Sequence, residues 1–377
     1  MATSRPSART REPSPGPLVI SAVGMVSPVG VNSAQSFTSV RANIPRKQER
    51  PDIYQCMPED PELDESEPLV ASLISHLDCR WRAEGSPTEW LALLAARAFA
   101  DLWNKAKLTT GDEGETGLFL SLPGRRPGWG PEQGEPFTQW LHDLAAHEPF
   151  THRQFSWIGS GGALGLCAEA CRLVREGRLK RAIVGGVDSY LFPKWLEPLD
   201  RAYRINSTRN HDGFCPGETA AFFLLEPAAE AGRRSLQPWA ELGATATASC
   251  APAPAGHDAG AALADVLSRV IPADVPQPPL VVCDLNGEMG RAREWGYALS
   301  RLGNALRSPL ALEHPAAVLG DVGAASGAAL VVLAAHYLHT KHRDRTSSVL
   351  WTASDGGERH AVLLARPQAP SNSPLGP

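Results

Sequence analysis

A run of polar side chains after residue 283 is the part of the sequence best suited to chemistry. In the segment DLNGEMGRAREWG, Asp284, Asn286 and Glu288 occupy alternate positions at the end of an expected strand. Alternate oxygen ligands suit a hard cation, and a new polar site built from this loop is one interpretation. The other is structural: Glu288 lies in the first turn of a helix, and Arg291 pairs with Glu294. We favour the structural interpretation and expect neither a metal nor a cofactor.

Cysteine and histidine patterns also favour structural roles. The seven cysteines are scattered, and no pair has the spacing of a zinc ribbon. Cys167 and Cys171 are four residues apart, so we expect two buried thiols on one face of a helix. His336, His339 and His342 recur near the end of the last helix, and a solvated helix C-terminus, which favours cations, explains them. These patterns predict reduced thiols in a cytoplasmic protein.

The elements that must position these residues alternate between strand and helix. A glycine run (159–162), a helix and the strand 181–187 follow a short apolar segment, which is the order of a βαβ unit. The second half repeats the pattern with the strand 280–284 and a glycine turn before the helix 322–339. The sequence therefore predicts an α/β protein with two similar halves.

Composition excludes several classes of protein. The chain has 377 residues, with 43% hydrophobic and 20% charged side chains and a formal net charge of −5. A balance so mild argues against electrostatic binding to nucleic acid or to a membrane surface. No apolar run reaches the length of a membrane span, and residues 1–17 lack the apolar core of a secretory signal. We expect disordered tails at 1–17 and 367–377 and a polar surface flap at about 44–68.

Four segments in order make the chain resemble the β-ketoacyl synthases, the condensing enzymes of the thiolase-like fold. They are VISAVGMVSPVG (19–30), RAIVGGVDSYL (181–191), HDGFCPGETAAFFLLE (211–226) and LGDVGAASGAALVVLAA (319–335). The resemblance implies two duplicated βαβαβαββ halves, residues 18–226 and 227–366, in a five-layer αβαβα sandwich. It also implies a dimer, and a site that takes an acyl group from an acyl-carrier protein or an acyl-CoA thioester in fatty acid or polyketide biosynthesis.

The catalytic set of that family is replaced in this chain. By the resemblance, the acylated cysteine falls on Ser160 and the two histidines fall on Asn286 and Asp321. The lysine expected five residues before the second histidine falls on Ala316, and the aromatic gate falls on Asp355. The acyl and oxyanion pocket implied by the resemblance comprises Gly159, Gly161, Phe214, Glu288, Asp355, Gly356 and Gly357.

This replacement removes the means of Claisen condensation. A serine hydroxyl needs an adjacent base, usually histidine, and a carboxylate with an ordinary pKa of about 4 is a poor match for a hydroxyl proton. We favour a protein that binds acyl groups or acyl-carrier protein without condensation, as a homodimer or as the partner of an active synthase, as chain-length factors are. An acyltransferase or thioesterase is the alternative, in which Ser160 accepts the acyl group, Asn286 polarises the carbonyl and Asp321 orients the hydroxyl or a water. The third possible function is that of a non-catalytic scaffold in a larger assembly.

Overall fold

The structure is a computed structural model. It describes residues 16–58, 65–77, 82, 86–109, 111–145, 150–251, 257–272, 279–306, 310–340 and 344–367. Most of the two predicted tails and residues 59–64 of the predicted flap lie outside these ranges. Among the described helices, none combines the length and the apolarity that a membrane span needs.

Ten strands form one mixed sheet in the order β12-β11-β13-β14-β10-β1-β9-β8-β6-β7. Their bounds are β1 (Leu18–Val26), β6 (Thr116–Ser121), β7 (His152–Ser156), β8 (Arg181–Ser189), β9 (Glu218–Pro227), β10 (Ala240–Ser249), β11 (Leu280–Cys283), β12 (Leu312–Glu313), β13 (Ser347–Ala353) and β14 (Glu358–Ala365). β1 pairs with β10 only at Val19–Glu241 and Ile20–Ala240, whereas it pairs with β9 along its length. The sheet therefore consists of two halves of five strands joined at a narrow seam.

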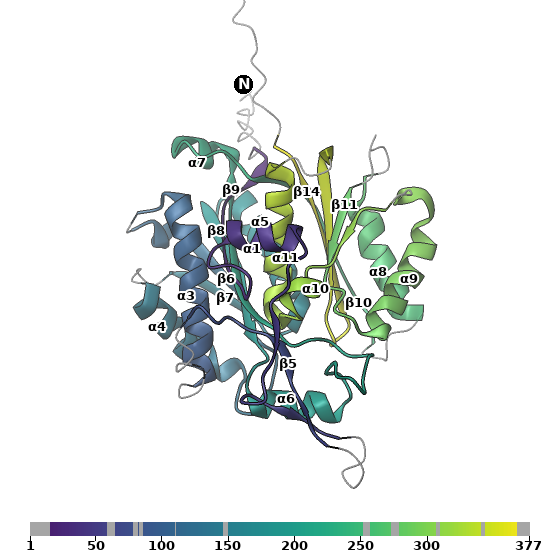
Figure 1. Cartoon of the computed structure of the whole chain (residues 1–377). Helices are drawn as coiled ribbons and strands as arrows, with labels where there is room; N and C mark the ends of the chain where they lie inside the picture. The colour runs from purple at the N-terminus through teal and green to yellow at the C-terminus, as the bar shows by residue number, and fades with distance from the viewer. Residues whose placement is uncertain are drawn as a thin grey trace, which may run out of the picture.

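Helices divide the molecule into five layers (Figure 1). The long helices are α3 (Pro87–Ala106), α4 (Gly134–Ala145), α5 (Gly162–Arg175), α8 (His257–Val270), α9 (Met289–Leu302) and α11 (Ser326–His339). α3 and α4 cover the outer face of one half-sheet, α8 and α9 cover the other, and α5 and α11 lie between the halves. The predicted αβαβα sandwich is confirmed.

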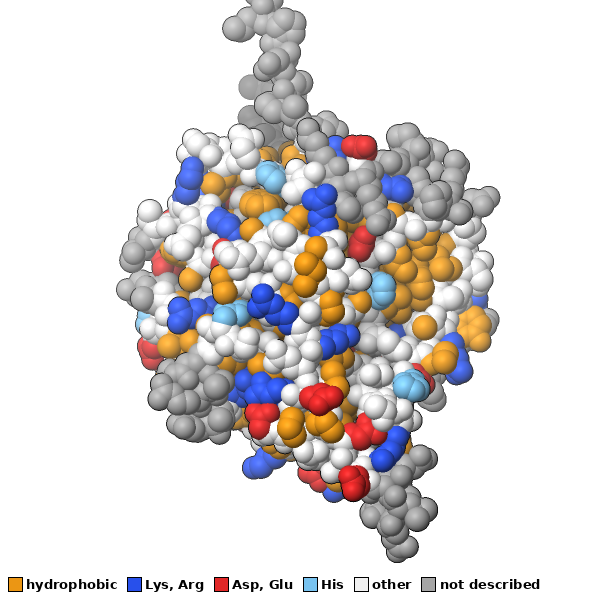
Figure 2. All heavy atoms as spheres, viewed as in Figure 1, with side chains coloured by type: hydrophobic (Ala, Val, Ile, Leu, Met, Phe, Trp, Pro, Cys, Tyr) orange, Lys and Arg blue, Asp and Glu red, His pale blue; other side chains and the backbone are white. Residues whose placement is uncertain are grey.

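Shorter elements complete the chain. They are α1 (Ser33–Arg41), α6 (Pro193–Arg201), α7 (Ala228–Arg233), α10 (Ala316–Leu319), the 3-10 turns η3 (Gly159–Gly161) and η5 (Gly323–Ala325), and the small strands β2 (Lys47–Glu49), β3 (Gln55–Cys56), β4 (Glu67–Pro68) and β5 (Val70–Ser72). β2 to β4 fall within the predicted flap, and β5 follows it. Figure 2 shows basic and acidic side chains interspersed over one face of the molecule.

The central helix α11 is enclosed on all sides. Every residue from Ser326 to Leu338 is buried, as a helix that is apolar all round must be. His336 is therefore buried, at 4% exposure, with its ring stacked on Phe37 of α1 at 4.9 Å. Burial lowers the pKa of His336 to about 4. The prediction of a solvated histidine is wrong for His336, His339 is exposed as predicted, and His342 lies outside the described residues.

Small residues bring the first turns of α5 and α11 together. A Cβ on Gly327 would lie 3.1 Å from the carbonyl oxygen of Ser160, so glycine permits this close approach. A Cβ on Gly186 of β8 would lie 2.5 Å from the carbonyl oxygen of Ala324, which fixes η5 against the sheet. The turns that lead into both central helices therefore meet near the ends of β8 and β11, which is where the candidate site lies.

Candidate functional site

Three predicted site residues form one hydrogen-bonded network. Asn286 follows β11, and its Nδ2 donates to Asp321 Oδ2 at 2.7 Å and to Glu288 Oε2 at 2.9 Å. The backbone N–H of Glu288 donates to Asn286 Oδ1 at 3.1 Å. The other carboxylate oxygen of Asp321 accepts from Gly323 N at 2.8 Å. Both ends of the Asn286 amide are thus occupied, and burial raises the pKa of Asp321 above its ordinary value.

Arg204 ties this network to the predicted gate residue, Asp355. Its Nε and Nη2 donate to the Glu288 carboxylate at 2.7 and 2.9 Å, and its Nη1 donates to Asp355 Oδ2 at 2.7 Å. The guanidinium carbon lies 5.5 Å from the ring centre of Phe214, another predicted pocket residue. Burial acts to raise the pKa of Asp355, but Arg291 and Arg204 outweigh it and hold that pKa below its ordinary value. Sequence reasoning missed Arg204, because the segment AYRINSTRN contains no motif.

The helix after β11 differs from the favoured structural interpretation. Glu288 is the N-cap residue of α9. Arg291 turns back to Asp284, with Nη1 and Oδ2 3.2 Å apart, while Glu294 pairs with Arg359 of β14 at 2.9 Å. The predicted Arg291–Glu294 pair is therefore wrong, since partners on other elements hold both side chains. Glu288 does lie at the start of the helix, as the structural interpretation expects, and the polar side chains of the loop contact partners on other elements.

Asp284 is a buried carboxylate at the base of this polar site. It is 7% exposed, and its Oδ2 also accepts from Ala353 N at 3.0 Å. Burial raises the pKa of Asp284 from 3.8 to about 6, against the opposing influence of Arg291. In the part of the chain that the structure describes, no group of three or more His, Cys, Asp or Glu side chains is placed to hold a metal ion.

Ser160 lies in η3, directly before α5, and is 7% exposed. Its Oγ forms no hydrogen bond with any residue that the structure describes, so no base is in place to activate it. The neighbouring N–H of Gly161 donates to Ser354 Oγ at 3.0 Å. Ser160 is thus not joined by a hydrogen bond to Asn286 or Asp321, although η3 and η5 are in contact.

The glycines predicted for the pocket form turns on either side of Ser354. Gly159 has a φ of 76° and begins η3, and Gly357 has a φ of 102°, both in the left-handed region. Gly357 N donates to Ser354 O at 3.1 Å, which closes the turn that contains Asp355 and Gly356. The structure therefore places η3 and this turn side by side, joined through Ser354.

Imidazole and thiol groups near these turns do not form a catalytic pair. His360 of β14 packs against Gly161, and its Nδ1 lies 3.2 Å from Thr247 Oγ1. Burial lowers the pKa of His360 to about 4, so its ring is neutral at pH 7. Cys250 Sγ donates to Gly357 O at 3.3 Å. Over the described ranges, no hydrogen bond joins an imidazole to a thiol.

The two thiols inside α5 are structural. Cys167 and Cys171 are both buried, as predicted. The hydrogen bond with Cys171 and burial raise the pKa of the Cys167 thiol well above its ordinary value. A thiol with a raised pKa is a poor nucleophile at neutral pH, which agrees with a structural role for Cys167.

An ion pair beneath η5 is the second feature that sequence reasoning missed. Arg126 donates from Nη1 and Nη2 to the two oxygens of Asp188 at 2.6 and 2.8 Å. Asp188, which is fully buried, also accepts from Ala324 N at 2.8 Å. The Arg126 guanidinium lies over the rings of Tyr190 and Trp195, 4.3 and 4.8 Å from their centres. Asp188 follows the Gly-Gly turn of a segment that carries the family resemblance, which is the one signal that could have indicated it.

Negative charge dominates the site. Four carboxylates and two guanidinium groups share it in the described structure: Asp284, Glu288, Asp321, Asp355, Arg204 and Arg291. Two of these carboxylates, Asp284 and Asp321, are buried, and a surplus of carboxylates opposes the development of a further negative charge beside them. The site is therefore poorly suited to a carbanion or an oxyanion.

A family model and several proteins of known sequence match the chain. The model described as "Beta-ketoacyl synthase, N-terminal domain" matches residues 160–231. The "Putative polyketide beta-ketoacyl synthase 1" of Streptomyces virginiae is 34% identical over 118 residues, which are 28% of this chain and 27% of that protein. The non-reducing polyketide synthase pkdA of Emericella nidulans is 25% identical over 254 residues, which are 57% of this chain and 10% of that protein. The chain thus spans well under a third of these relatives.

Solved structures share the fold over nearly the whole chain. The oxazolomycin ketosynthase domain of Streptomyces albus JA3453 has a TM-score of 0.71 and 16% identity, covering 96% of this chain and 76% of that one. The ishigamide ketosynthase/chain length factor has a TM-score of 0.68 and 18% identity, covering 94% and 100%. A type II polyketide ketosynthase in complex with its acyl-carrier protein has a TM-score of 0.71 and 13% identity, covering 94% and 100%.

Proposed function

We propose that this chain, a ketosynthase-like protein of the thiolase-like fold, is a non-condensing partner that associates with an active synthase and its acyl-carrier protein. The proposal rests on the hydrogen bonding of Ser160, Asn286 and Asp321, the positions where the family resemblance places the catalytic residues. Asn286 and Asp321 are bonded to each other, and the hydroxyl of Ser160 has no described partner that could act as its base. The fold that positions a condensing site is retained, while the groups that perform condensation are replaced.

The residues at positions 286 and 321 bear on the decarboxylation step of the condensation. An amide at position 286 and a carboxylate at 321 stand where the decarboxylation step requires two imidazoles. The surplus of carboxylates raises the energy of the carbanion that decarboxylation would form. An acyltransferase that uses Ser160 is less well supported than the partner function, because a serine nucleophile requires a base within hydrogen-bonding reach.

The site contains a small cavity and a larger polar pocket. The cavity beside Asp321 has a volume of about 20 Å³, which is room for about one water molecule. The larger pocket, of about 370 Å³, is lined by charged side chains that include Arg204, Glu288 and Asp355. Arg204 and Arg291 hold Asp355 at the predicted gate through ion pairs of 2.7 and 3.3 Å. A pocket lined by charged side chains suits an acyl chain poorly, so we place the function of the chain on its surface.

Strand β7 is the surface that best fits a partner of the same fold. It is the last strand of the sheet, and within the described ranges only β6 pairs with it. An unpaired strand edge is a template for strand addition by another chain. Phe155 of β7 and Trp157, just after the strand, are half-buried, with ring centres 6.3 Å apart, and a partner could cover them. One of the similar structures is a ketosynthase/chain length factor, which supports a synthase as that partner.

Association through β7 is testable by disrupting the strand edge. We expect the chain to co-elute as a complex when it is co-expressed with a ketosynthase and an acyl-carrier protein from its own genome. Gln154→Lys adds a charge to the half-buried middle of β7 and should weaken the complex about 100-fold, since edge lysines block strand addition. The measurement is size-exclusion chromatography with light scattering, followed by titration of the purified partners.

A matched control distinguishes an effect of charge at the edge of β7 from an effect of added charge anywhere on the surface. Ile44, which is 56% exposed, lies outside the sheet, and Ile44→Lys introduces the same charge there. The Ile44 variant should bind as the unmodified chain does. Failure of the chain to associate with the synthase, or equal binding by both variants, would rule out the proposed use of β7.

A further inference from the structure

Asn286 is followed by Gly287, and this is the only Asn-Gly pair among the 377 residues of the chain. An asparagine side chain loses ammonia when the backbone nitrogen of the next residue attacks its Cγ atom and closes a succinimide ring. A Cβ atom on that next residue hinders the attack, and glycine has none. Asn286 is therefore the asparagine whose local sequence hinders this reaction least.

The backbone nitrogen that would attack is free in the folded chain. Gly287 is exposed, and its N–H donates no hydrogen bond to any residue that the structure describes. Its φ is 112°, and a Cβ at this position would lie 3.1 Å from the carbonyl oxygen of Gly213, so position 287 favours glycine. Asn286 itself is half-buried, so water can reach the ring and hydrolyse it.

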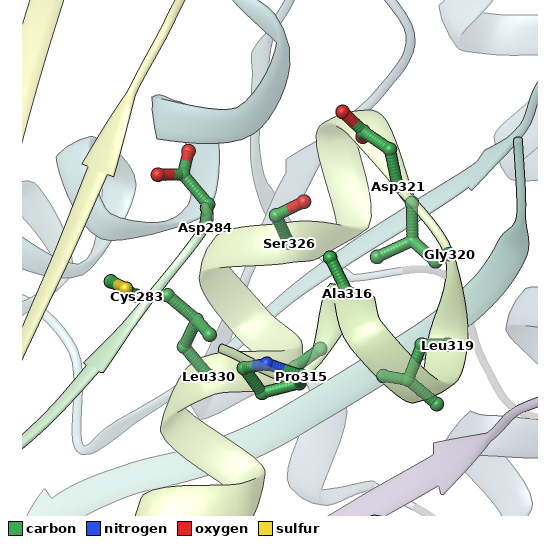
Figure 3. A pocket seen from close by; sticks show the side chains of 11 residues that line it. Cys283, Asp284, Pro315, Ala316, Leu319, Gly320, Asp321, Ser326 and Leu330 are labelled. Carbon is green, nitrogen blue, oxygen red and sulfur yellow. The ribbon is translucent and has the colours of Figure 1, made fainter. Parts of the chain in front are cut away.

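The hydrogen bonds of the Asn286 side chain determine what its conversion would do to the site. Nδ2, the atom lost as ammonia, joins the carboxylates of Asp321 and Glu288, at 2.7 and 2.9 Å. Figure 3 shows the Asp321 carboxylate directed away from Leu319, which lines the apolar side of the small cavity. A carboxylate at position 286 would replace both hydrogen bonds with repulsion between like charges.

We propose that Asn286 is a deamidation site, and that its conversion to aspartate or isoaspartate opens the Asp321–Asn286–Glu288 network irreversibly. The Gly287 nitrogen forms a bond to Asn286 Cγ, the Cγ–Nδ2 bond breaks, and Nδ2 leaves as ammonia with the proton of the Gly287 N–H. Water then opens the ring. Cleavage between Cγ and the Gly287 nitrogen gives aspartate, and cleavage between the main-chain carbonyl carbon and that nitrogen gives isoaspartate. This proposal does not depend on the partner function proposed above.

The network slows this reaction without preventing it. Departure of Nδ2 breaks its hydrogen bonds to Asp321 and Glu288, and Asn286 Oδ1 is also held by Glu288 N at 3.1 Å. Each of these bonds has to be lost or re-formed along the reaction path, which costs free energy. We therefore expect Asn286 to react more slowly in the folded chain than in urea, but faster than the other asparagines of the folded chain.

Peptide mapping by mass spectrometry during incubation of the freshly purified chain at mildly alkaline pH tests the proposal. We expect the peptide that contains Asn286 to gain the mass of the acid while Asn210 remains an amide. Asn210 is the internal control, because His211 follows it. Its Nδ2 also has two acceptors, the carbonyl oxygens of Tyr203 and Ile205, at 2.7 and 2.9 Å. Persistence of the Asn286 amide in the folded chain after complete conversion in urea, or equal conversion at Asn210, would overturn the proposal.

Three variants connect the reaction to its effect on the network. Asn286→Gln keeps an amide but would need a larger ring, so no conversion is expected at this position. Asn286→Asp introduces the charge of the product directly and should lower the midpoint of urea-induced unfolding, and the converted chain should shift in the same direction. Asn104→Asp, on the exposed surface of α3, is the control and should stay close to the unmodified midpoint. An unchanged midpoint for Asn286→Asp would show that conversion does not open the network.

Discussion

Replacing Arg126 by alanine is expected to destabilise the protein by about 3–5 kcal/mol, the usual cost of removing one partner of a buried ion pair. Asp188 would be left fully buried with its charge unpaired. The same carboxylate accepts from Ala324 N, so the loss would also loosen the turn η5 next to Asp321. Urea-induced unfolding measures the change in the free energy of unfolding.

Two further variants distinguish the loss of a buried ion pair from the loss of an arginine at the surface. Arg126→Lys keeps the positive charge but loses the second hydrogen bond and the contact with Tyr190, so it should fall between the alanine variant and the unmodified protein. Arg172→Ala removes an arginine with two ion pairs, to Glu169 and Glu176, on the exposed surface of α5. The Arg172 variant should unfold close to the unmodified midpoint, because exposed ion pairs contribute little. Equal losses at positions 126 and 172 would refute the assigned role of Arg126.

Asp284 should give the protein a distinctive dependence of stability on pH. Its pKa of about 6 in the folded protein lies above the ordinary value of 3.8. The folded state therefore binds the proton more tightly than the unfolded state does. The stabilisation from this proton is complete below about pH 4 and is lost as the pH rises through about 6. Over that interval the shift of about two units corresponds to about 3 kcal/mol.

Asp284→Asn isolates this contribution, because an amide does not titrate. The free energy of unfolding of the unmodified protein, minus that of the variant, should fall by about 3 kcal/mol between pH 4 and pH 7. Both proteins are unfolded in urea at each pH, in a buffer whose only cation is N-methylglucamine. A difference that stays constant over this range would mean that Asp284 titrates normally.

The sequence predicted the fold well, because periodicity and glycine turns record it locally. The turns at Gly159 and Gly320 and the apolar strands between them reveal the βαβ units of each half without tertiary information. The enclosure of α11 is harder to predict, since the pattern of His336 and His339 alone resembles a solvated helix end. Only the arrangement of α1 and α11 in space shows that His336 packs against Phe37.

The candidate site was predicted in part for a similar reason. Asn286, Glu288 and Asp321 were identified because they occupy positions in segments that resemble a family, and the structure joins them. Arg204 reaches the site, and Arg126 reaches Asp188 beneath η5, from loops far away in the sequence, and no spacing indicates which carboxylate an arginine will meet. Arg291 shows the same limit, because helical spacing suggested Glu294 while the tertiary structure selected Asp284.

The absence of a reactive nucleophile is the claim on which the rest depends, and mass spectrometry tests it directly. The purified chain is incubated with acyl-CoA and with acyl-carrier protein carrying an acyl thioester, and its intact mass is then measured beside that of Ser160→Ala. We expect no mass increase in either protein, because the hydroxyl of Ser160 has no base among its described neighbours. An acyl adduct on the unmodified chain that disappears in Ser160→Ala would contradict this account and would show that the chain is an acyltransferase.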